Sequence, residues 1–315
     1  MSVVIPCHRA GKYLSEAIDS VLAQESRVGS LEVVVVDNHS TDDETRDVLG
    51  VWRRDGRVRI VENAEDLGPA AGRNVGIGVA RGTWVAFLDA DDVWLPGALE
   101  ARWQAIESEP DAEWIGADFR MWYEDGSLEE TGHYQKDDAV GRILAPAYAS
   151  GRSGPLRLRR PISQFLKFSL AWIGTVLVKR ELLLRLGGFE PSLRLAEDVH
   201  LWYRLASVTD FFFVPTIVAL YRQHPVSLTS RERRGGGLQL AWERVYALLR
   251  SDAAFQPYRG QLRAKVAAAH ERAAYYHRAR GEGWKAARAA ARALTYTPTR
   301  PAIWKNLVAA LLQRR

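Results

Sequence analysis

Apolar and polar residues follow two different periods along the first third of the chain. Short, nearly continuous apolar runs predict buried strands at Ser2–Ile5, Leu31–Val36, Val58–Val61 and Trp84–Leu88. Between these runs, helical apolar spacing predicts helices at Tyr13–Gln24, Thr41–Leu49 and Ala70–Ala80. Strict alternation of strand and helix indicates a mostly parallel sheet flanked by helices, which is a Rossmann-like α/β fold.

The pattern is less regular in the middle of the chain. Asp125-Gly126 lies between alternating apolar residues and predicts a hairpin within Trp114–Glu129. Thr131–Pro161 has no clear period, so we expect a mobile loop that could serve as a lid. Beyond it, the spacing predicts strands at Thr175–Val178, Phe211–Val214 and Ile217–Tyr221, helices at Arg180–Leu186 and Glu197–Ala206, and a turn at Gly187-Gly188.

The last quarter of the chain has a different composition. From Arg233–Gly237 onward, Ala, Arg and Leu dominate, and helical spacing continues through Leu312. We therefore place a boundary there, between an α/β domain at 1–232 and a C-terminal α-helical region at 238–315. No convincing internal repeat is visible in the helical region. It is either an amphipathic bundle with a solvated basic face, or a segment that attaches to a membrane surface or to a second copy.

Composition narrows the class of protein. The chain has 315 residues, of which 47% are hydrophobic, enough for a large core. Cys7 is the single cysteine, which excludes a disulfide framework and favours a reducing compartment such as the cytoplasm. We expect neither a signal peptide nor a spanning helix. The net charge of +5 favours anionic partners, but the aromatic residues are not interleaved with a basic stripe, so nucleic acid is not expected.

Polar residues cluster where the predicted sheet ends. The four clusters are Pro6–Arg9, Asp37-Asn38, Arg73-Asn74 and Asp89–Asp92. In an open α/β sheet, ligands bind beyond the carboxyl ends of the strands. The four clusters together therefore predict one site.

The most acidic cluster lies in the stretch FLDADDVW, residues 87–94. On an extended segment, Asp89 and Asp91 point to the same side, where both can face one hard cation such as Mg²⁺ or Mn²⁺. Such ions commonly complete their shell with water and substrate phosphate oxygens. The alternative is a helix N-cap with favourable N-terminal charges, to which Asp92 can contribute.

Four segments occur in an order that is familiar from a known enzyme family. They are SVVIPCHRAGKYLSEAIDSVLAQ, EVVVVDNHSTDDE, GPAAGRNVGIGVARGTWVAFLDADDVW and GGFEPSLRLAEDVHLWYRLA. Together they resemble the catalytic domain of glycosyltransferase family 2, whose fold is called GT-A, from Ser2 to Ser230. The resemblance implies an enzyme that moves a sugar from a nucleoside-diphosphate sugar to an acceptor hydroxyl. It also implies inversion at the anomeric carbon and a divalent metal, Mn²⁺ or Mg²⁺, at a D-x-D motif.

The resemblance assigns the first two clusters to the nucleotide. Pro6, His8 and Arg9 match the family's first nucleotide-binding turn, with His8 in the place of an aromatic residue that packs on the base. A solvated surface histidine is the alternative. Asp37 and Asn38 stand where the family usually has two aspartates, and the Asn38 amide can both accept from and donate to a base. Asp37 could instead cap the helix that follows.

The next two clusters correspond to the diphosphate and the metal. Arg73 matches an arginine near the diphosphate or the base, where a guanidinium suits phosphate oxygens. The alternative is an ion pair, with Asp89 as a candidate partner. Asp91 matches the metal-binding aspartate, and Asp89 and Ala90 lie beside it on the nucleotide side.

The resemblance places the acceptor side in the last of the four segments. Glu197-Asp198 matches the family's E-D motif, in which the aspartate corresponds to the general base. Without the resemblance, helix capping accounts for the same pair. Trp202 either shapes the acceptor pocket or packs in the core. His224 belongs to a Y-R-x-H segment and either adds a nitrogen ligand to the ion or is solvated.

Two rival functions remain open at this point. A non-catalytic nucleotide-binding or partner-binding protein on the same fold would carry the same residues. A nucleotidyltransferase is disfavoured, because PCHRAGKYL carries only one glycine after the first strand. The Q-x-x-R-W segment of processive synthases is absent, so we expect one sugar per encounter. The expected acceptor is a saccharide or a lipid-linked saccharide in cell-envelope polysaccharide biosynthesis, with the basic tail as a possible peripheral membrane contact.

Overall fold

The computed structural model describes residues 1–24, 30–149, 154–225, 227, 230 and 237–312. The chain forms two compact units. The first contains Met1–Ser192 and Leu201–Gln223, and the second contains Leu193–His200 and His224–Arg315. Residues 231–236 lie outside the described residues, and they include 233–236 of the expected boundary at 233–237.

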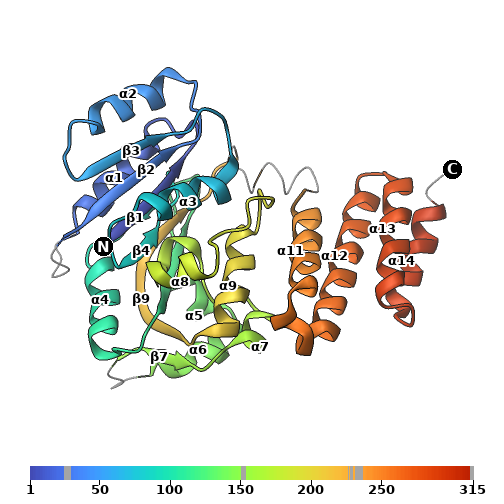
Figure 1. Ribbon diagram of the computed structural model, residues 1–315. Coiled ribbons are helices and arrows are strands. Elements are labelled where there is room, and N and C mark those ends of the chain that lie inside the picture. The colour runs from blue at the N-terminus through green and yellow to red at the C-terminus, as the bar shows by residue number, and fades with distance from the viewer. Residues whose placement is uncertain (25–29, 150–153, 226, 228–229, 231–236, 313–315) are drawn as a thin grey trace. The chain divides into compact units, whose positions relative to one another are not determined.

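A mixed sheet forms the centre of the first unit, with the strand order β3-β2-β1-β4-β8-β6-β9-β5, and β7 pairs with β9 (Figure 1). The four strands predicted in the first third are present and mutually parallel, as β1 (Ser2–Cys7), β2 (Glu32–Asp37), β3 (Val58–Glu62) and β4 (Trp84–Phe87). Most of their residues are fully buried, which is why they appear in the sequence as continuous apolar runs. The predicted α/β fold with a mostly parallel core is confirmed.

The helices between these strands also occur where the spacing predicts them. They are α1 (Tyr13–Leu22), α2 (Asp43–Trp52) and α3 (Gly68–Val79), and α4 (Ala98–Ser108) follows β5 (Val93–Trp94). The cap of α2 is Asp42, whose carboxylate accepts a hydrogen bond from the Thr45 N–H at 3.0 Å. Helix α3 lies close against the sheet, because a Cβ on Gly76 would come within 2.3 Å of Val4. Glycine at this position permits that approach.

The second half of the sheet reverses direction and then returns. Strand β8 (Leu177–Lys179) is antiparallel to both β4 and β6 (Trp114–Trp122), so β6 points the same way as β4. Strand β9 (Phe211–Arg222) is parallel to β6, and its register shifts beside Asp118. The two strands predicted over this range are therefore one irregular strand. The remaining elements of this half are α7 (Ile162–Phe165), the 3₁₀ helix η1 (Ile173–Thr175), α8 (Arg180–Arg185) and α9 (Glu197–Val208).

The predicted hairpin forms its turn but not its second strand. Gly126 has a left-handed φ of 84°, and Tyr123 N–H donates to the Ser127 carbonyl at 2.9 Å. Only a single bridge, between Trp122 and Leu128, pairs the two arms. Strand β6 takes its main partners from β8 and β9 instead, which pair with its two edges.

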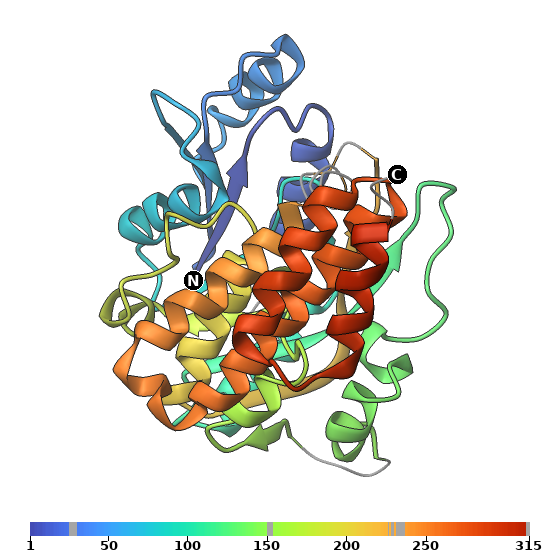
Figure 2. The same cartoon turned by 90° about the vertical axis from the view of Figure 1, so that its right-hand side faces the viewer.

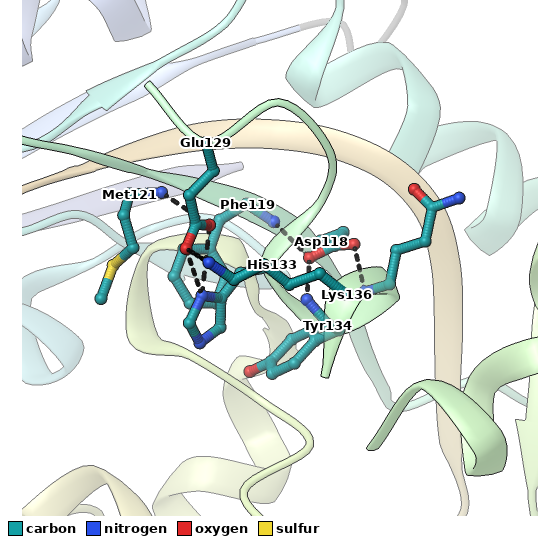
Figure 3. Close-up of polar contacts among 8 residues, drawn as sticks. Asp118, Phe119, Met121, Glu129, His133, Tyr134 and Lys136 are labelled. Carbon is teal, nitrogen blue, oxygen red and sulfur yellow. Dashed lines mark hydrogen bonds and ion pairs between the residues drawn. The ribbon is translucent and has the colours of Figure 1, made fainter. Parts of the chain in front are cut away.

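The prediction of a mobile loop over Thr131–Pro161 is wrong for the described residues of that span. They include α5 (His133–Lys136), α6 (Val140–Tyr148) and β7 (Leu156–Leu158), and residues 150–153 lie outside the described part. Two buried acids hold the segment (Figure 3). Asp118 is fully buried and accepts from Tyr134 N–H at 2.9 Å. It also accepts from the Tyr148 hydroxyl at 2.5 Å. These partners are 16 and 30 residues away, so no local period reveals them.

Glu129 is the second acid of this network. Its carboxylate accepts from Met121 N–H at 3.1 Å and from His133 Nδ1 at 3.1 Å, and it forms an ion pair with Lys136 (Figure 3). The hydrogen bonds from these three partners outweigh burial and hold the pKa of Glu129 below its usual value. The ordered segment is therefore held by two acids, Asp118 and Glu129.

The second unit consists mainly of stacked helices. They are α11 (Gly237–Ser251), the 3₁₀ helix η2 (Ala253–Tyr258), α12 (Arg259–Ala279), α13 (Gly283–Tyr296) and α14 (Pro301–Leu312). Helices α12, α13 and α14 lie side by side around alanines and Ile303, and α12 contacts both of the others (Figure 2). Small side chains let helices approach closely, which explains the alanine-rich sequence. Within the described part of the chain, no helix is both long and apolar enough to cross a bilayer.

Candidate active site

The strand order reverses between β1 and β4. From β1 the chain proceeds outward through β2 to β3, and then returns to β4 on the other side of β1. Ligands of open α/β sheets bind at this switch point, beyond the carboxyl ends of the strands. The segment Pro6–Arg9 lies at the end of β1, and Asp89–Asp92 follows β4. The structure therefore brings these two predicted clusters to one edge, next to Asp37 at the end of β2, which pairs with Cys7.

The loop after β1 presents His8 to solvent. Its Nδ1 lies 2.7 Å from the Asn38 carbonyl, and because a carbonyl can only accept, Nδ1 carries the proton. The ring is thus fixed at one edge while it remains exposed. Arg9 follows, with its N–H bonded to Ser40 Oγ at 2.9 Å and its guanidinium to Thr41 Oγ1 at 2.8 Å. These contacts tie the loops after β1 and β2 together.

Left-handed backbone conformations mark the same loops. Among the described residues, the non-glycine positions with positive φ are Arg9 (52°), His39 (58°), Arg160 (36°) and Ala196 (57°). Three of them adjoin predicted site residues, because Arg9 follows His8, His39 follows Asn38 and Ala196 precedes Glu197. Such conformations cost roughly 1–3 kcal/mol each and concentrate at ligand sites.

Asn38 is turned into the protein rather than toward solvent. It is 2% exposed, its amide donates to the Gly68 carbonyl at 3.1 Å, and its oxygen accepts from Asn63 Nδ2 at 2.7 Å. A Cβ on Gly72 would lie 2.5 Å from Asn38 Nδ2, so glycine is needed there. Asn38 therefore links the start of α3 to the end of β2. Both ends of its amide are engaged by the protein.

A cavity of about 350 Å³ lies beside the end of β2. It is lined by Asp37, His39, Ser40, Arg46, Leu49, Gly50, Arg53, Glu62 and Asn63. Asp37 is 5% exposed, and its Oδ1 accepts from the Ser40 N–H at 3.1 Å and hydroxyl at 2.6 Å. The walls offer acid, amide and guanidinium groups, which suit a polar ligand with several hydrogen-bonding edges.

Arg73 and Asp89 form an ion pair, the alternative that the sequence left open. Arg73 Nη2 and Asp89 Oδ1 are 2.5 Å apart. The arginine side chain is 4% exposed and the aspartate 31%, so the pair lies at the margin of the interior. The guanidinium also lies 5.5 Å from the Phe189 ring centroid. Neighbouring Asn74 both donates to and accepts from the Phe189 backbone at 2.8 Å, a role that the sequence did not suggest.

Asp91 and Asp92 continue the acidic edge, with Ala90 buried between Asp89 and Asp91. Asp91 is partly exposed, whereas Asp92 is fully buried. Burial, and then the charges of Asp91 and Asp89, raise the pKa of Asp92 well above its usual value. Its Oδ1 accepts from the Arg222 N–H at 2.8 Å, and among the described residues Oδ2 has no hydrogen-bond partner.

This edge fits a divalent cation. Among the described residues, no three or more His, Cys, Asp or Glu are placed so that they could hold a metal ion by themselves, so the protein would supply only part of a ligand set. A small hard cation is commonly held by one or two carboxylates plus substrate phosphates. A positive ion would also relieve the repulsion among the three adjacent carboxylates, which is evident in the pKa of Asp92.

The acceptor-side residues are at the start of α9 and after β9. Glu197 is 6% exposed, and Asp198 is partly exposed, with its Oδ1 accepting from the Val199 N–H at 2.7 Å. A helix cap binds the N–H two or three residues onward, whereas this contact is to the next residue, and it occupies one carboxylate oxygen. His224 is partly buried, and its carbonyl accepts from Ser227 N–H at 3.2 Å. Glu197, Asp198 and His224 belong to the second unit.

Trp202 lies in the core of the first unit. It is fully buried and stacks on Trp114 with ring centroids 5.7 Å apart. Phe189 meets it edge to face at 6.4 Å. Of the two interpretations that the sequence allowed, core packing is the one that this environment supports.

Comparison with known families identifies the family of the chain. A family model described as "Glycosyl transferase family 2" matches residues 2–183. The chain belongs to glycosyltransferase family 2. The matched range contains the clusters at the ends of β1, β2 and β4 and ends before Glu197. The clusters at the switch point therefore lie within the range that shows the family.

Named relatives of this family 2 glycosyltransferase agree. It is 26% identical over 249 residues to glycosyltransferase GlyG of Streptococcus pneumoniae. The aligned region covers 78% of this chain and 76% of GlyG. Over 103 residues it is 39% identical to the putative teichuronic acid biosynthesis glycosyltransferase TuaG of Bacillus subtilis, covering 32% of this chain and 40% of TuaG.

Solved structures show the same fold. S. aureus TarS 1–349 in complex with UDP-GlcNAc matches with a TM-score of 0.66 and 16% identity, covering 99% of this chain and 88% of that one. Mannosyltransferase PcManGT from Pyrobaculum calidifontis, in complex with GDP-Man and Mn²⁺, matches with a TM-score of 0.59 and 20% identity, covering 99% and 86%. At these identities the likeness concerns the fold, which is GT-A.

Proposed function

We propose that this family 2 enzyme transfers a sugar from a nucleoside-diphosphate sugar to an acceptor hydroxyl, with inversion and with a divalent metal at Asp91. The observation that carries the proposal is the charge arrangement at the switch point. There the Arg73–Asp89 ion pair, partly exposed Asp91 and buried Asp92 form one edge. An edge with both acids and a guanidinium suits a cation together with a diphosphate.

The donor half of the site follows from this arrangement. The nucleoside lies along Pro6, His8 and Arg9, with the His8 ring available for stacking on the base because only its Nδ1 edge is engaged. Asp37 and the cavity beside it supply hydrogen-bonding groups for the base. Asn38 contributes by fixing the loop, since its amide is already bonded at both ends.

The diphosphate half uses the acidic edge. Asp91 holds the cation, with Asp89 and Ala90 beside the ribose, and Arg73 keeps Asp89 in place. When bound, Mn²⁺ or Mg²⁺ supplies Lewis-acid stabilisation of charge that develops on the diphosphate oxygens. His224 is a candidate nitrogen ligand for the same ion.

The acceptor half rests on Asp198 as general base. Its carboxylate takes the proton of the acceptor hydroxyl while the oxygen bonds to the anomeric carbon and the bond to the diphosphate breaks. A single displacement of this kind inverts the anomeric configuration. The left-handed conformation of Ala196 supports a role for this turn beyond capping, because strain of that kind concentrates at functional sites. Glu197 is the neighbouring acceptor-side acid.

The acceptor class is a saccharide or a lipid-linked saccharide, within cell-envelope polysaccharide biosynthesis in the cytoplasm. The names of relatives such as TuaG support this assignment. Peripheral contact with an anionic membrane surface through the helical tail is part of the proposal. Helix α13 exposes Lys285, Arg288 and Arg292 together with Trp284, which is 65% exposed. Basic residues beside an exposed tryptophan are typical of membrane-surface helices, and the same face could mediate self-association.

Turnover measurements test the proposal. Release of nucleoside diphosphate is followed from uridine, guanosine, thymidine and cytidine diphosphate sugars, with Mn²⁺ and a lipid-linked saccharide fraction. Asp198→Asn should lower turnover about 10²–10⁴-fold, the range of a lost general base, without weakening nucleotide binding. The matched control is Asp43→Asn, which removes another acid from the first turn of a helix and should leave turnover unchanged.

Two results would count against the proposal. Equal turnover by Asp198→Asn and the wild type would remove Asp198 as the base. Nucleotide binding by the wild type without turnover of any donor would favour the non-catalytic binding protein.

A further inference from the structure

Arg222 is the last residue of β9, and its backbone and its side chain both make polar contacts. Its backbone N–H donates to Asp92 Oδ1 at 2.8 Å, and its Nε donates to the Asp91 carbonyl at 2.8 Å. Its Nη2 forms an ion pair with Glu16 on α1. All of these residues belong to the first unit.

Two aromatic rings enclose the same guanidinium. Its central carbon lies 3.8 Å from the Trp122 ring centroid and 4.6 Å from that of Tyr13. The Arg222 side chain is 13% exposed, so these contacts occur in a largely dry environment, where a cation over a ring is worth more than at the surface. The planar fork of arginine can bond in its plane while both of its faces stack, which lysine cannot do.

The contacts connect three separate parts of the first unit to the acidic edge. Trp122 ends β6, while Tyr13 and Glu16 lie on the first turns of α1. Immediately beyond Asp92, Val93 and Trp94 pair with Leu220 and Ala219 of β9, and Trp94 N–H donates to Ser20 Oγ at 3.0 Å. The segment that carries Asp91 is thus held to β9 both by this ladder and by Arg222.

We propose that Arg222 is a positioning residue for the metal-binding carboxylate, acting through the Asp91 carbonyl and the Asp92 carboxylate rather than by touching the diphosphate. This inference rests on the proposed function, because it assumes a cation at Asp91. It adds a residue 131 positions from Asp91 along the chain, whose five contacts would set the geometry of the D-x-D segment. Partners that orient ligand-bearing groups typically change metal affinity about 10–100-fold when removed.

Metal-dependent nucleotide binding tests the role without requiring an acceptor. Whichever of the uridine, guanosine, thymidine and cytidine diphosphates binds the wild type is titrated by calorimetry, first without metal and then over a range of Mn²⁺ concentrations. Arg222→Met should raise the Mn²⁺ concentration for half-saturation about 10–100-fold, with metal-free affinity changed by less than about twofold. Glu16→Gln should shift it in the same direction by less, because the other four contacts of Arg222 remain.

Two further variants separate positioning from charge and from general stability. Arg222→Lys keeps the positive charge but loses the fork and the stacking, so it should behave like Arg222→Met. Arg157→Met is the matched control, because Arg157 lies on β7, which pairs with the other end of β9. Arg157 also bonds an acid, Asp210, at 2.7 Å and lies 5.1 Å from an aromatic ring, that of Phe212. It should leave the Mn²⁺ dependence unchanged. If Arg222→Met fails to fold, Arg222→Lys and Glu16→Gln carry the comparison.

Three outcomes would overturn the inference. An unchanged Mn²⁺ dependence in Arg222→Met would remove the positioning role. Full rescue by Arg222→Lys would show that charge alone matters, and weaker metal-free binding in Arg222→Met would indicate a direct diphosphate contact. A wild type that binds the nucleotide without any Mn²⁺ effect would instead overturn the proposed metal site, so the two failures are distinguishable.

Discussion

The ion pair between Arg73 and Asp89 should respond very differently to the loss of each partner. The arginine side chain is 4% exposed and the aspartate 31%, at a separation of 2.5 Å. Removing one partner of a fully buried pair costs about 3–5 kcal/mol, whereas an exposed pair is worth about 0–1 kcal/mol. In Asp89→Asn the charge left behind is the buried guanidinium of Arg73. We therefore expect the free energy of unfolding to fall by about 2–3 kcal/mol, close to the cost for a fully buried pair. The value is below that cost because repulsion with Asp91 is also relieved.

The opposite variant leaves its charge where water can reach it. In Arg73→Met the remaining carboxylate of Asp89 can hydrate, and the methionine fills much of the same volume beside Phe189. We expect a loss of about 1–2 kcal/mol, part of it from the cation–π contact. The double variant leaves no charge behind and should be more stable than Asp89→Asn by about 1 kcal/mol, within the range of couplings between contacting residues.

Urea unfolding followed by tryptophan fluorescence measures these differences. The comparison requires equal m-values, because the chain has two units and only then do midpoints report stability alone. A larger loss in Arg73→Met than in Asp89→Asn, or strict additivity in the double variant, would refute the reasoning.

Three further outcomes follow from other parts of the structure. Gly72→Ala should destabilise the protein by about 1–3 kcal/mol and weaken nucleotide binding, because the new Cβ would lie 2.5 Å from Asn38 Nδ2. Its control is Gly78→Ala in the same helix, where a Cβ would meet nothing within 4 Å. In urea unfolding this control should be neutral or stabilising by about 0.5–1 kcal/mol. Burial raises the pKa of the Cys7 thiol to about 12, so at pH 8 the native protein should react with a disulfide reagent far more slowly than the urea-unfolded chain; equal rates would contradict this. Burial lowers the pKa of His270 below 6.5, so the unfolded chain binds the proton more readily than the folded chain. The thermal midpoint of the helical unit, measured by circular dichroism, should therefore fall as the pH drops below about 6.5. His270→Gln should reduce that pH dependence.

The local elements of this fold were predictable because their signals are local. The runs around Val33–Val36 and Val85–Leu88 are fully buried in the sheet, and alternation with helices is enough to predict their parallel order. The strand-end rule then places Asp37 and Asp89 at one edge without any structural information. Both the fold class and the location of the candidate site come from these two regularities.

The features that sequence reasoning missed depend on contacts between distant residues. The order of the segment after Thr131 comes from two buried acids, Asp118 and Glu129, whose partners no periodicity marks. Arg222 contacts Asp91 across 131 residues of chain, and the only signal for it was its place in the Y-R-x-H segment. Asn38 shows another limit of such reasoning, since a polar residue at a strand end can direct both ends of its amide into the protein.

The central claim is that the acidic edge beyond β4 binds a nucleoside diphosphate through a divalent cation. Calorimetry of uridine, guanosine, thymidine and cytidine diphosphates, with and without Mn²⁺, tests it directly on the wild type and Asp91→Ala. We predict tight binding of one diphosphate that requires Mn²⁺ and is lost in Asp91→Ala. Equal binding by the two proteins, or binding that is indifferent to Mn²⁺, would contradict the claim.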